Sequence, residues 1–269
     1  MSTFQKVIDE GYYLDIGKSM SDGWELFKKG ASSFIGFTVI FIVILIIISE
    51  VMEYVPVPLV GSFISDLLLA CLTAGFFVFA FHLTSRQEDF GQFFEGFQDI
   101  AQLGIFQIVY NLIQIPILII ITLLIIPWEL FLELSSGGIT DLEYFLEEMQ
   151  GILATEFVGR AILGIFLAAA LSIYIGISYS LVIPLITLGK LSFWEAMETS
   201  RKVTAQKFFT FFGLYLIMGL IVGIGTLITC LLGIIVLIPF YFCTVYAVYT
   251  SIFKEAADQG PLTGELDMF

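Results

Sequence analysis

The sequence predicts an all-α membrane protein with six transmembrane helices, and three observations lead to this fold class. Hydrophobic residues make up 58% of the 269 residues, whereas charged residues make up only 13%. The mean hydropathy is +0.98. Several apolar runs are also longer than the roughly 18–20 residues that a helix needs to cross a bilayer. A soluble domain of this size could not bury so much apolar surface.

The predicted transmembrane domain covers residues 1–253. Its six spans are expected at about residues 33–49, 59–83, 103–126, 161–187, 208–229 and 233–253. The first 14 residues are predicted to be a polar tail without a cleaved signal peptide, because they contain no apolar core. Residues 127–160 are rich in Asp and Glu and are predicted to form an acidic loop, and residues 254–269 a flexible acidic tail.

Three polar–apolar segments, residues 16–29, 85–101 and 189–202, each precede a pair of spans. We interpret them as amphipathic helices that lie on the membrane surface, with Trp24, Phe93 and Trp194 at the level of the lipid headgroups. A short soluble helix is the alternative for the first segment, but the span that follows directly favours the interfacial position.

The three segments also resemble one another, which suggests a parallel threefold repeat. Each has a start typical of a capping box, in which a Ser side chain and an acidic side chain cover each other's free backbone donors. The three pairs are Ser19 with Asp22, Ser85 with Glu88, and Ser192 with Glu195. Identity between the units is weak, so either a homologous triplication or a mere similarity of hydropathy order would explain the pattern.

The basic residues predict the orientation. If both termini lie on one side, that side receives ten of the eleven Lys and Arg residues and the other side only Arg160. The positive-inside rule then places both termini in the cytoplasm and the acidic loop outside. The net charge of −14 argues against nucleic acid as a partner.

Polar residues inside the predicted spans are the candidates for chemistry. Asp66 is the only carboxylate in a span, and intramembrane carboxylates are often functional. Because it is solitary and close to the outer edge, we favour a structural role, with Arg160 or Asn111 as a partner. Gln107, Asn111 and Gln114 share one face of the third span, where they would line a polar path or, as we favour, form hydrogen bonds between helices.

Small residues recur every four positions in the fourth span, and a similar pair lies in the fifth. Such a stripe allows another backbone to approach closely, so it predicts the packing core of the bundle or a dimer seam. The predicted packing residues are Gly164, Ala168, Ser172, Gly176, Ser180, Gly219 and Gly223.

No pattern in the sequence predicts a metal ion, a cofactor or a catalytic residue. His82 has no Cys or His at a ligand spacing. Cys71, Cys230 and Cys243 lie in apolar runs, where they are expected to be packing residues.

The segment Ser178-Tyr-Ser-Leu-Val-Ile-Pro-Leu-Ile-Thr-Leu-Gly-Lys-Leu-Ser-Phe-Trp-Glu-Ala-Met-Glu-Thr-Ser-Arg resembles a bacterial family of six-helix membrane domains. These domains are attached to some glycerophosphodiester phosphodiesterases and also occur alone as uncharacterised integral membrane proteins. The resemblance is clearest over residues 175–253. It implies an inner-membrane helical bundle without an established activity, and it carries over no catalytic residue, since the phosphodiesterase domain is missing.

These observations favour a non-enzymatic membrane protein: a scaffold, an assembly factor or a lipid-interacting factor. The expected partners are membrane lipids, and other membrane proteins or a second copy of the chain are further candidates. The expected location is the bacterial cytoplasmic membrane. A transporter with a polar path near Asp66 and Asn111 is the alternative, and a lipid-modifying enzyme ranks third because no acid–base or metal set is present.

Overall fold

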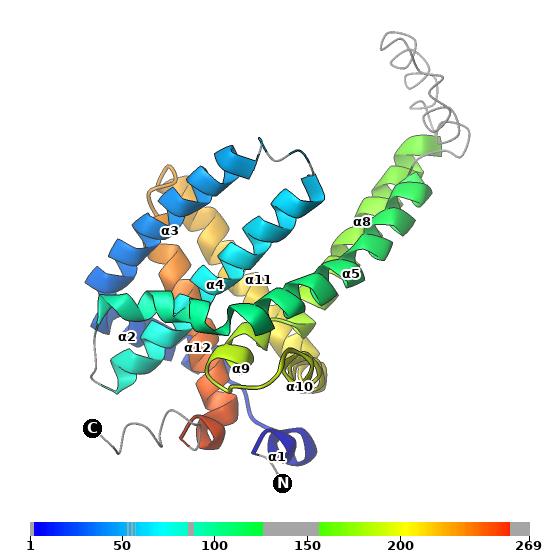
Figure 1. Ribbon diagram of the computed structural model, residues 1–269. Coiled ribbons are helices and arrows are strands. Elements are labelled where there is room, and N and C mark those ends of the chain that lie inside the picture. The colour runs from blue at the N-terminus through cyan, green and yellow to red at the C-terminus, as the bar shows by residue number, and fades with distance from the viewer. Residues whose placement is uncertain are drawn as a thin grey trace. The chain divides into compact units, whose positions relative to one another are not determined.

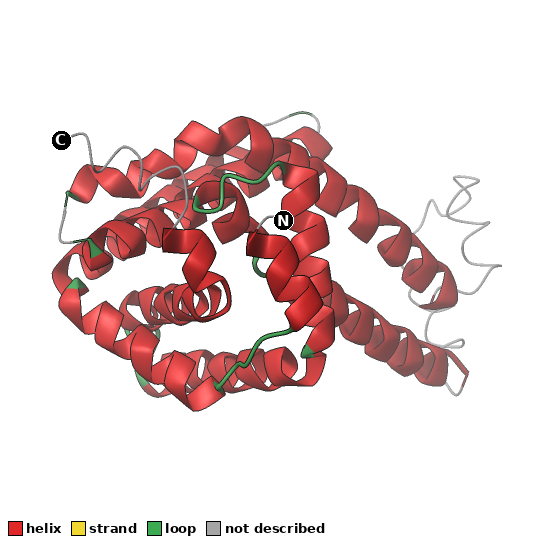
Figure 2. Cartoon of the chain, turned by 90° about the horizontal axis from the view of Figure 1, so that it is seen from below, coloured by secondary structure: helices red, strands yellow, loops and turns green. Residues whose placement is uncertain are grey.

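The structure, a computed structural model, describes residues 3–52, 54, 56, 58–85, 89–125 and 156–258. All its regular elements in these ranges are helices, joined by short loops (Figure 2). In chain order they are α1 (Thr3–Glu10), α2 (Ile16–Lys29), α3 (Ala31–Met52), α4 (Pro58–Thr84), η1 (Phe90–Asp99), α5 (Ile100–Ile125), α8 (Glu156–Ser178), α9 (Val182–Thr187), α10 (Phe193–Gln206), α11 (Phe208–Ile228) and α12 (Ile234–Asp258). Figure 1 labels most of them.

Six helical segments in the described ranges are long and apolar enough to cross a membrane. They are Ala31–Met52, Val60–Thr84, Phe90–Ile120, Ile162–Thr187, Phe208–Ile228 and Ile234–Phe253. This result confirms the predicted all-α fold class with six membrane helices. Most of the predicted acidic loop and most of the predicted acidic tail lie outside the described residues, and residues 156–160 at the end of the predicted loop already belong to α8.

The chain divides into two compact units. The first unit comprises residues 1–108 and 177–269, and the second comprises residues 109–176. The first unit therefore holds α1 to α4, η1, the beginning of α5 and α9 to α12. The second unit holds the rest of α5 and nearly all of α8.

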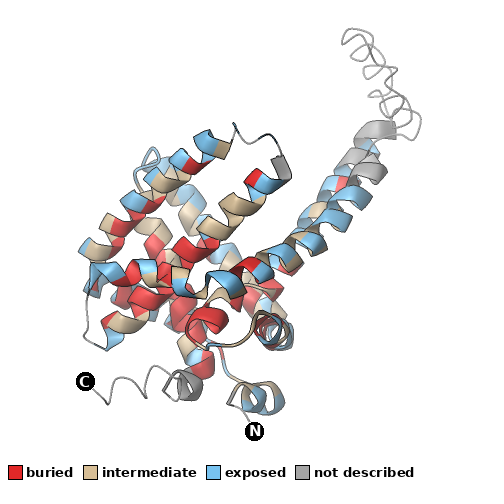
Figure 3. Ribbon diagram, in the orientation of Figure 1, coloured by how far each residue is buried: buried red, intermediate tan, exposed pale blue. Residues whose placement is uncertain are grey.

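The core of the first unit is aromatic. Phe93 of η1 lies between the rings of Phe37 and Phe79, at centroid distances of 4.1 Å on both sides. Phe76 stacks on Phe242 of α12 at 4.6 Å. Buried residues are concentrated on α4, α9 and the second half of α12 (Figure 3). Helices α3, α4, η1 and α12 thus share one core.

The prediction for the first 14 residues was wrong. Residues 1–14 are not only a polar tail, because they contain α1, whose Phe4 ring lies 5.4 Å from the ring of Phe253 in α12. The fourth predicted span, residues 161–187, matches the membrane segment Ile162–Thr187, and this segment contains a break between the end of α8 at Ser178 and the start of α9 at Val182.

The helix starts also differ from two of the three predicted capping boxes. Helix α2 is capped by Asp15, which accepts a hydrogen bond from the backbone N–H of Lys18, and Ser19 lies inside the helix. Element η1 is a 3₁₀ helix capped by Asp89, so its start is not at Ser85, and Glu88 lies outside the described residues. Only the box of Ser192 and Glu195 is present as predicted, at the start of α10.

Candidate functional site

Three segments of the first unit, α2, η1 and α10, form what we call the collar. Helix α2 packs on α12, η1 packs on α4, and α10 packs on α9. Each collar segment therefore contacts the last membrane segment of the preceding set, in cyclic order. This contact order is what a parallel threefold repeat would produce, although the repeat itself stays a prediction.

The collar exposes aromatic side chains. Trp24 of α2 is 42% exposed, and its ring meets Phe240 of α12 edge to face at 5.4 Å. Trp194 of α10 is 64% exposed, and Phe90 and Phe94 of η1 are exposed as well. Phe93, by contrast, is completely buried between two other rings, so it is a core residue and not an interfacial anchor as predicted.

The contact between α4 and η1 requires glycine on both sides. A Cβ on Gly75 of α4 would collide with the backbone carbonyl of Phe93. A Cβ on Gly96 of η1 would collide with the carbonyl of Cys71. The two backbones therefore touch directly, and this contact places Phe93 in the aromatic core.

Hydroxyl groups of α10 form hydrogen bonds with the backbone at the break between α8 and α9. Ser200 donates from Oγ to the carbonyl of Ser178 at 2.7 Å and accepts from the backbone N–H of Leu181 at 3.3 Å. Ser200 and Thr204 are fully buried. Because a helix break leaves backbone groups without intrahelical partners, Ser200 both satisfies these groups and fixes α10 on the membrane segment.

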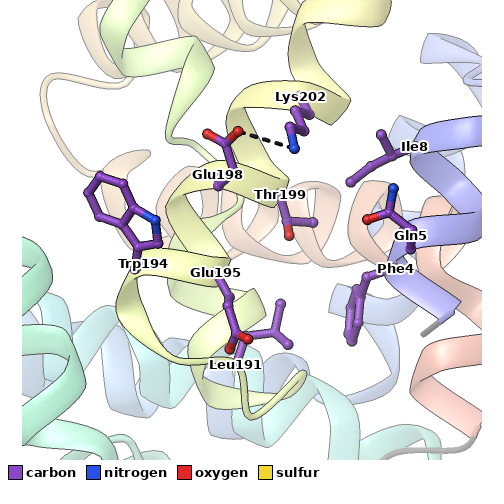
Figure 4. A pocket seen from close by; sticks show the side chains of 9 residues that line it. All are labelled: Phe4, Gln5, Ile8, Leu191, Trp194, Glu195, Glu198, Thr199 and Lys202. Atoms are coloured by element: carbon purple, nitrogen blue, oxygen red, sulfur yellow. Dashed lines mark ion pairs between the residues drawn. The ribbon is translucent and has the colours of Figure 1, made fainter. Parts of the chain in front are cut away.

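A groove of about 230 Å³ lies between α1 and α10 (Figure 4). Its apolar lining consists of Phe4 and Ile8 of α1 and Leu191, which precedes α10. The remaining lining residues are Gln5, Trp194, Glu195, Glu198, Thr199 and Lys202. A second cavity of about 370 Å³ adjoins it at Leu191 and Glu195 and is also lined by Asp99, Gln102, Ile186, Lys190 and Ser192.

Charged side chains of both signs are fixed around the two cavities. The carboxylate of Glu198 accepts hydrogen bonds from Arg201 at 2.9 Å and lies 3.2 Å from Lys202 Nζ. Lys190 Nζ lies 2.9 Å from Asp99 Oδ2. Desolvation alone would raise the pKa of Glu198, but the hydrogen bonds from Arg201 and Lys202 outweigh it and lower this pKa. Glu198 therefore stays ionised at neutral pH.

Helix α1 and the residues that follow it are attached to α10 by two hydrogen bonds, which fix one wall of the groove. Gln206 donates to the carbonyl of Ile8 at 2.7 Å, and the Tyr12 hydroxyl donates to the carbonyl of Val203 at 2.8 Å. Burial raises the pKa of Tyr12. Sequence reasoning missed this groove. The apolar Phe4, Val7 and Ile8 at helical spacing, with Gly11 at a positive φ of 77° after the helix, were the available signal.

The polar residues of the spans take structural positions where the structure describes their partners. Gln107 donates from Nε2 to the backbone carbonyl of Asp66 at 3.0 Å, which is a hydrogen bond between α5 and α4. Gln114 donates to the hydroxyl of Tyr110 one turn away at 3.1 Å. Asn111 lies in the second unit, and the side chain of Arg160 is outside the described residues, so the suggested pairing with Asp66 stays a prediction.

The small-residue stripe stays a prediction as the packing core of the bundle, because its members are divided between the two units. An added Cβ on Gly176, Gly219 or Gly223 would meet no atom within 4 Å. Ser172 is exposed, and Ser180 lies in the turn after α8, where its Oγ bonds to the carbonyl of Ile177. Of the remaining two, Gly164 is buried and Ala168 half-buried. The alternative, a dimer seam, stays a prediction.

His82 and the cysteines complete the predicted set. His82 Nε2 lies 3.5 Å from Glu95 Oε2, which links α4 to η1. Cys71 and Cys243 are buried as expected, but Cys230 is exposed, because α11 ends at Ile228 and Cys230 lies in the turn before α12. Among the described residues, no three His, Cys, Asp or Glu side chains gather where they could hold a metal ion.

Comparison of the chain with known protein families, with curated proteins and with solved structures finds no match. The resemblance to the phosphodiesterase-associated membrane domains therefore stays a prediction.

Proposed function

We propose that the chain is a non-enzymatic integral membrane protein that acts as a lipid-interacting scaffold or assembly factor. The collar is the observation that carries this proposal. Its three segments are held on α12, α4 and α9 and present Trp24 and Trp194 outward. Amphipathic aromatic rings are favoured at the boundary between lipid and water.

The charged side chains of the collar favour a binding role over a catalytic one. The charged side chains around the groove pair with one another, as in Glu198 with Arg201 and Lys190 with Asp99. A transporter has less support, because the amide of Gln107 is engaged with the backbone of Asp66. The proposed location is the bacterial cytoplasmic membrane, with both termini in the cytoplasm, and it rests on the bias of the basic residues.

Quenching of tryptophan fluorescence by brominated lipids tests the proposal. In chains that keep only Trp24 or only Trp194, we expect the strongest quenching from lipids brominated near the headgroup end of the acyl chain. The matched control places the only Trp at position 220 (Leu220→Trp), in the middle of α11, where Leu220 is 52% exposed. This control should be quenched best by deeply brominated lipids.

The absence of quenching at both collar positions, with normal quenching of the control, would contradict the proposal. It would mean that the exposed rings face water or a protein partner in place of lipid.

A further inference from the structure

Helix α1 packs less deeply on the first unit than the collar helix α2. Among the described side chains of α1, from Phe4 to Glu10, none is buried: the apolar ones are half-buried and the polar ones are exposed. Helix α2 buries several residues, among them Gly23, where a Cβ would collide with the backbone of Thr244 in α12. The groove of about 230 Å³ between α1 and α10 is the space that the shallow packing of α1 leaves (Figure 4).

The residues that follow α1 are anchored firmly. The Tyr12 hydroxyl donates to the backbone carbonyl of Val203 at 2.8 Å, and Leu14 is buried. Gly11 lies between α1 and this anchor, with a positive φ of 77°. A Cβ on Gly11 would meet no atom within 4 Å. The chain therefore turns at a residue whose conformation suits glycine and which no neighbouring atom holds in place.

Helix α1 itself is attached by contacts at the surface of the unit. Gln206 donates to the backbone carbonyl of Ile8 at 2.7 Å, and the Phe4 ring lies 5.4 Å from the ring of Phe253 in α12. With eight residues, α1 is also shorter than the roughly 12–15 residues that an isolated helix needs to be even marginally stable in water. Its helical structure therefore depends on these contacts, and α1 unfolds when they are lost.

We propose that α1 is a strap that opens about Gly11. In the closed state the Phe4 ring covers Phe253, which is fully buried, and α1 faces Thr199 of α10, which is buried and lines the groove. In the open state residues 3–10 leave α10 and α12 and lose their helical structure, while the residues after Gly11 stay anchored. Opening exposes Thr199 and Phe253 to water, so the strap controls access to the groove. This proposal is independent of the lipid interaction proposed above.

Hydrogen exchange of the full-length chain in detergent measures the opening. The amides at the end of α1 are hydrogen-bonded, as in Gly11 N–H to the Val7 carbonyl at 3.1 Å. We expect them to be protected, yet to exchange at least about tenfold faster than those of α10, because a shallowly packed element opens without the rest of the fold.

A pair of glycine variants tests the hinge. Gly11→Ala should accelerate exchange of α1 by about five- to thirtyfold, because the positive φ is disfavoured for alanine and the added methyl group meets no other obstacle. Gly219→Ala on α11 is the matched control. It also adds a methyl group into open space, but inside a helix and without a positive φ, so it should leave the exchange of α1 unchanged.

Maleimide labelling of Thr199→Cys provides a second readout of the opening. The background is Cys230→Ala, because Cys230 is exposed and would react itself. We expect Gly11→Ala to accelerate this labelling by the same factor as the exchange of α1. Trp194→Cys is the control within the groove. Because Trp194 is 64% exposed, the labelling rate at this position should not depend on Gly11→Ala.

Equal protection of α1 and α10 would overturn the proposal, because α1 would then open only together with the rest of the unit. Unprotected amides in α1 of the wild type would overturn it as well, since α1 would then not be docked. An unchanged exchange of α1 in Gly11→Ala would show that Gly11 is not the hinge. Equal labelling of Thr199→Cys with and without Gly11→Ala would show that α1 does not control access to the groove.

Discussion

Glycines mark two regions of the molecule: the contact between α4 and η1, and the small-residue stripe of α8 and α11. Only in the first do the glycines touch a neighbouring backbone. At Gly75 and Gly96 the backbone of one element touches the backbone of the other, whereas Gly219 and Gly223 face open space. The difference teaches that glycine spacing alone does not identify a close contact within the first unit. The contact between α4 and η1 is also surrounded by large aromatic side chains, above all Phe93, which stacks on Phe37 and Phe79.

Removal of the Phe93 ring should have the largest effect on the stability of the α4–η1 contact. Phe93→Ala is expected to lower the free energy of unfolding by about 3–5 kcal/mol, because the ring is fully buried between Phe37 and Phe79. Phe94→Ala is the matched control on the same 3₁₀ helix, and it should cost much less, because Phe94 is 42% exposed. Thermal or denaturant unfolding in detergent measures both. Equal losses would mean that η1 is not docked on α4 as described.

The two kinds of glycine should respond oppositely to alanine. Gly75→Ala is expected to cost about 1–3 kcal/mol or more, because the added methyl group must displace the backbone of Phe93. Gly219→Ala should be neutral or should stabilise α11 by up to about 1 kcal/mol, because alanine is the better helix former. Unfolding of the two variants under the same conditions checks the difference. A greater loss of stability in Gly219→Ala than in Gly75→Ala would show that the stripe, and not the α4–η1 contact, is tightly packed.

The polar contact at the helix break should have an intermediate effect. Ser200→Ala leaves the Leu181 N–H and the Ser178 carbonyl without their α10 hydroxyl, and we expect a loss of about 1–3 kcal/mol. Ser65→Ala is a suitable control, since the Ser65 hydroxyl donates to the Gly61 carbonyl of its own helix. Limited proteolysis at the loop of residues 188–192 provides a second measurement. Unchanged proteolysis in Ser200→Ala would contradict the role of this hydroxyl in fixing α10.

The smallest effect on stability is expected in the stripe. Gly176→Leu adds a side chain where no atom lies within 4 Å, so the unfolding temperature should stay close to that of the wild type. If the stripe is a dimer seam, this variant should instead change the molecular mass of the detergent complex measured by light scattering. A marked loss of stability in a monomeric Gly176→Leu variant would support the interpretation of the stripe as the bundle core.

Hydropathy was sufficient to predict the membrane helices, because the cost of unsatisfied backbone groups in lipid leaves a long apolar run few other structures. The bounds of α2 were predicted from a different signal, the helical spacing of Trp24 and the other apolar residues around it. The break before Val182 was not predicted, because it depends on a hydroxyl of Ser200, which is distant in the sequence.

The candidate site was only partly predictable. Trp24 and Trp194 were predicted to lie at the level of the lipid headgroups; both are exposed, and their position in the membrane stays a prediction. Phe93 is also aromatic and has a similar setting in the sequence, but the backbone contact with Gly75 and the rings of Phe37 and Phe79 bury it. The groove depends on α1, whose few apolar residues are a weak signal beside the strong hydropathy of the spans.

The most direct test of the central claim, a collar on one face of a six-span protein, uses the exposed Cys230. This residue lies in the turn between α11 and α12, at the end of α11 that is distant from α10, while Cys71 and Cys243 are buried. A membrane-impermeant maleimide should label Cys230 from outside in intact cells. In a Cys230→Ala background, a cysteine in the collar (Lys18→Cys or Trp194→Cys) should be labelled only after the membrane is opened. Labelling of Cys230 and of both collar positions from the same side would contradict the account.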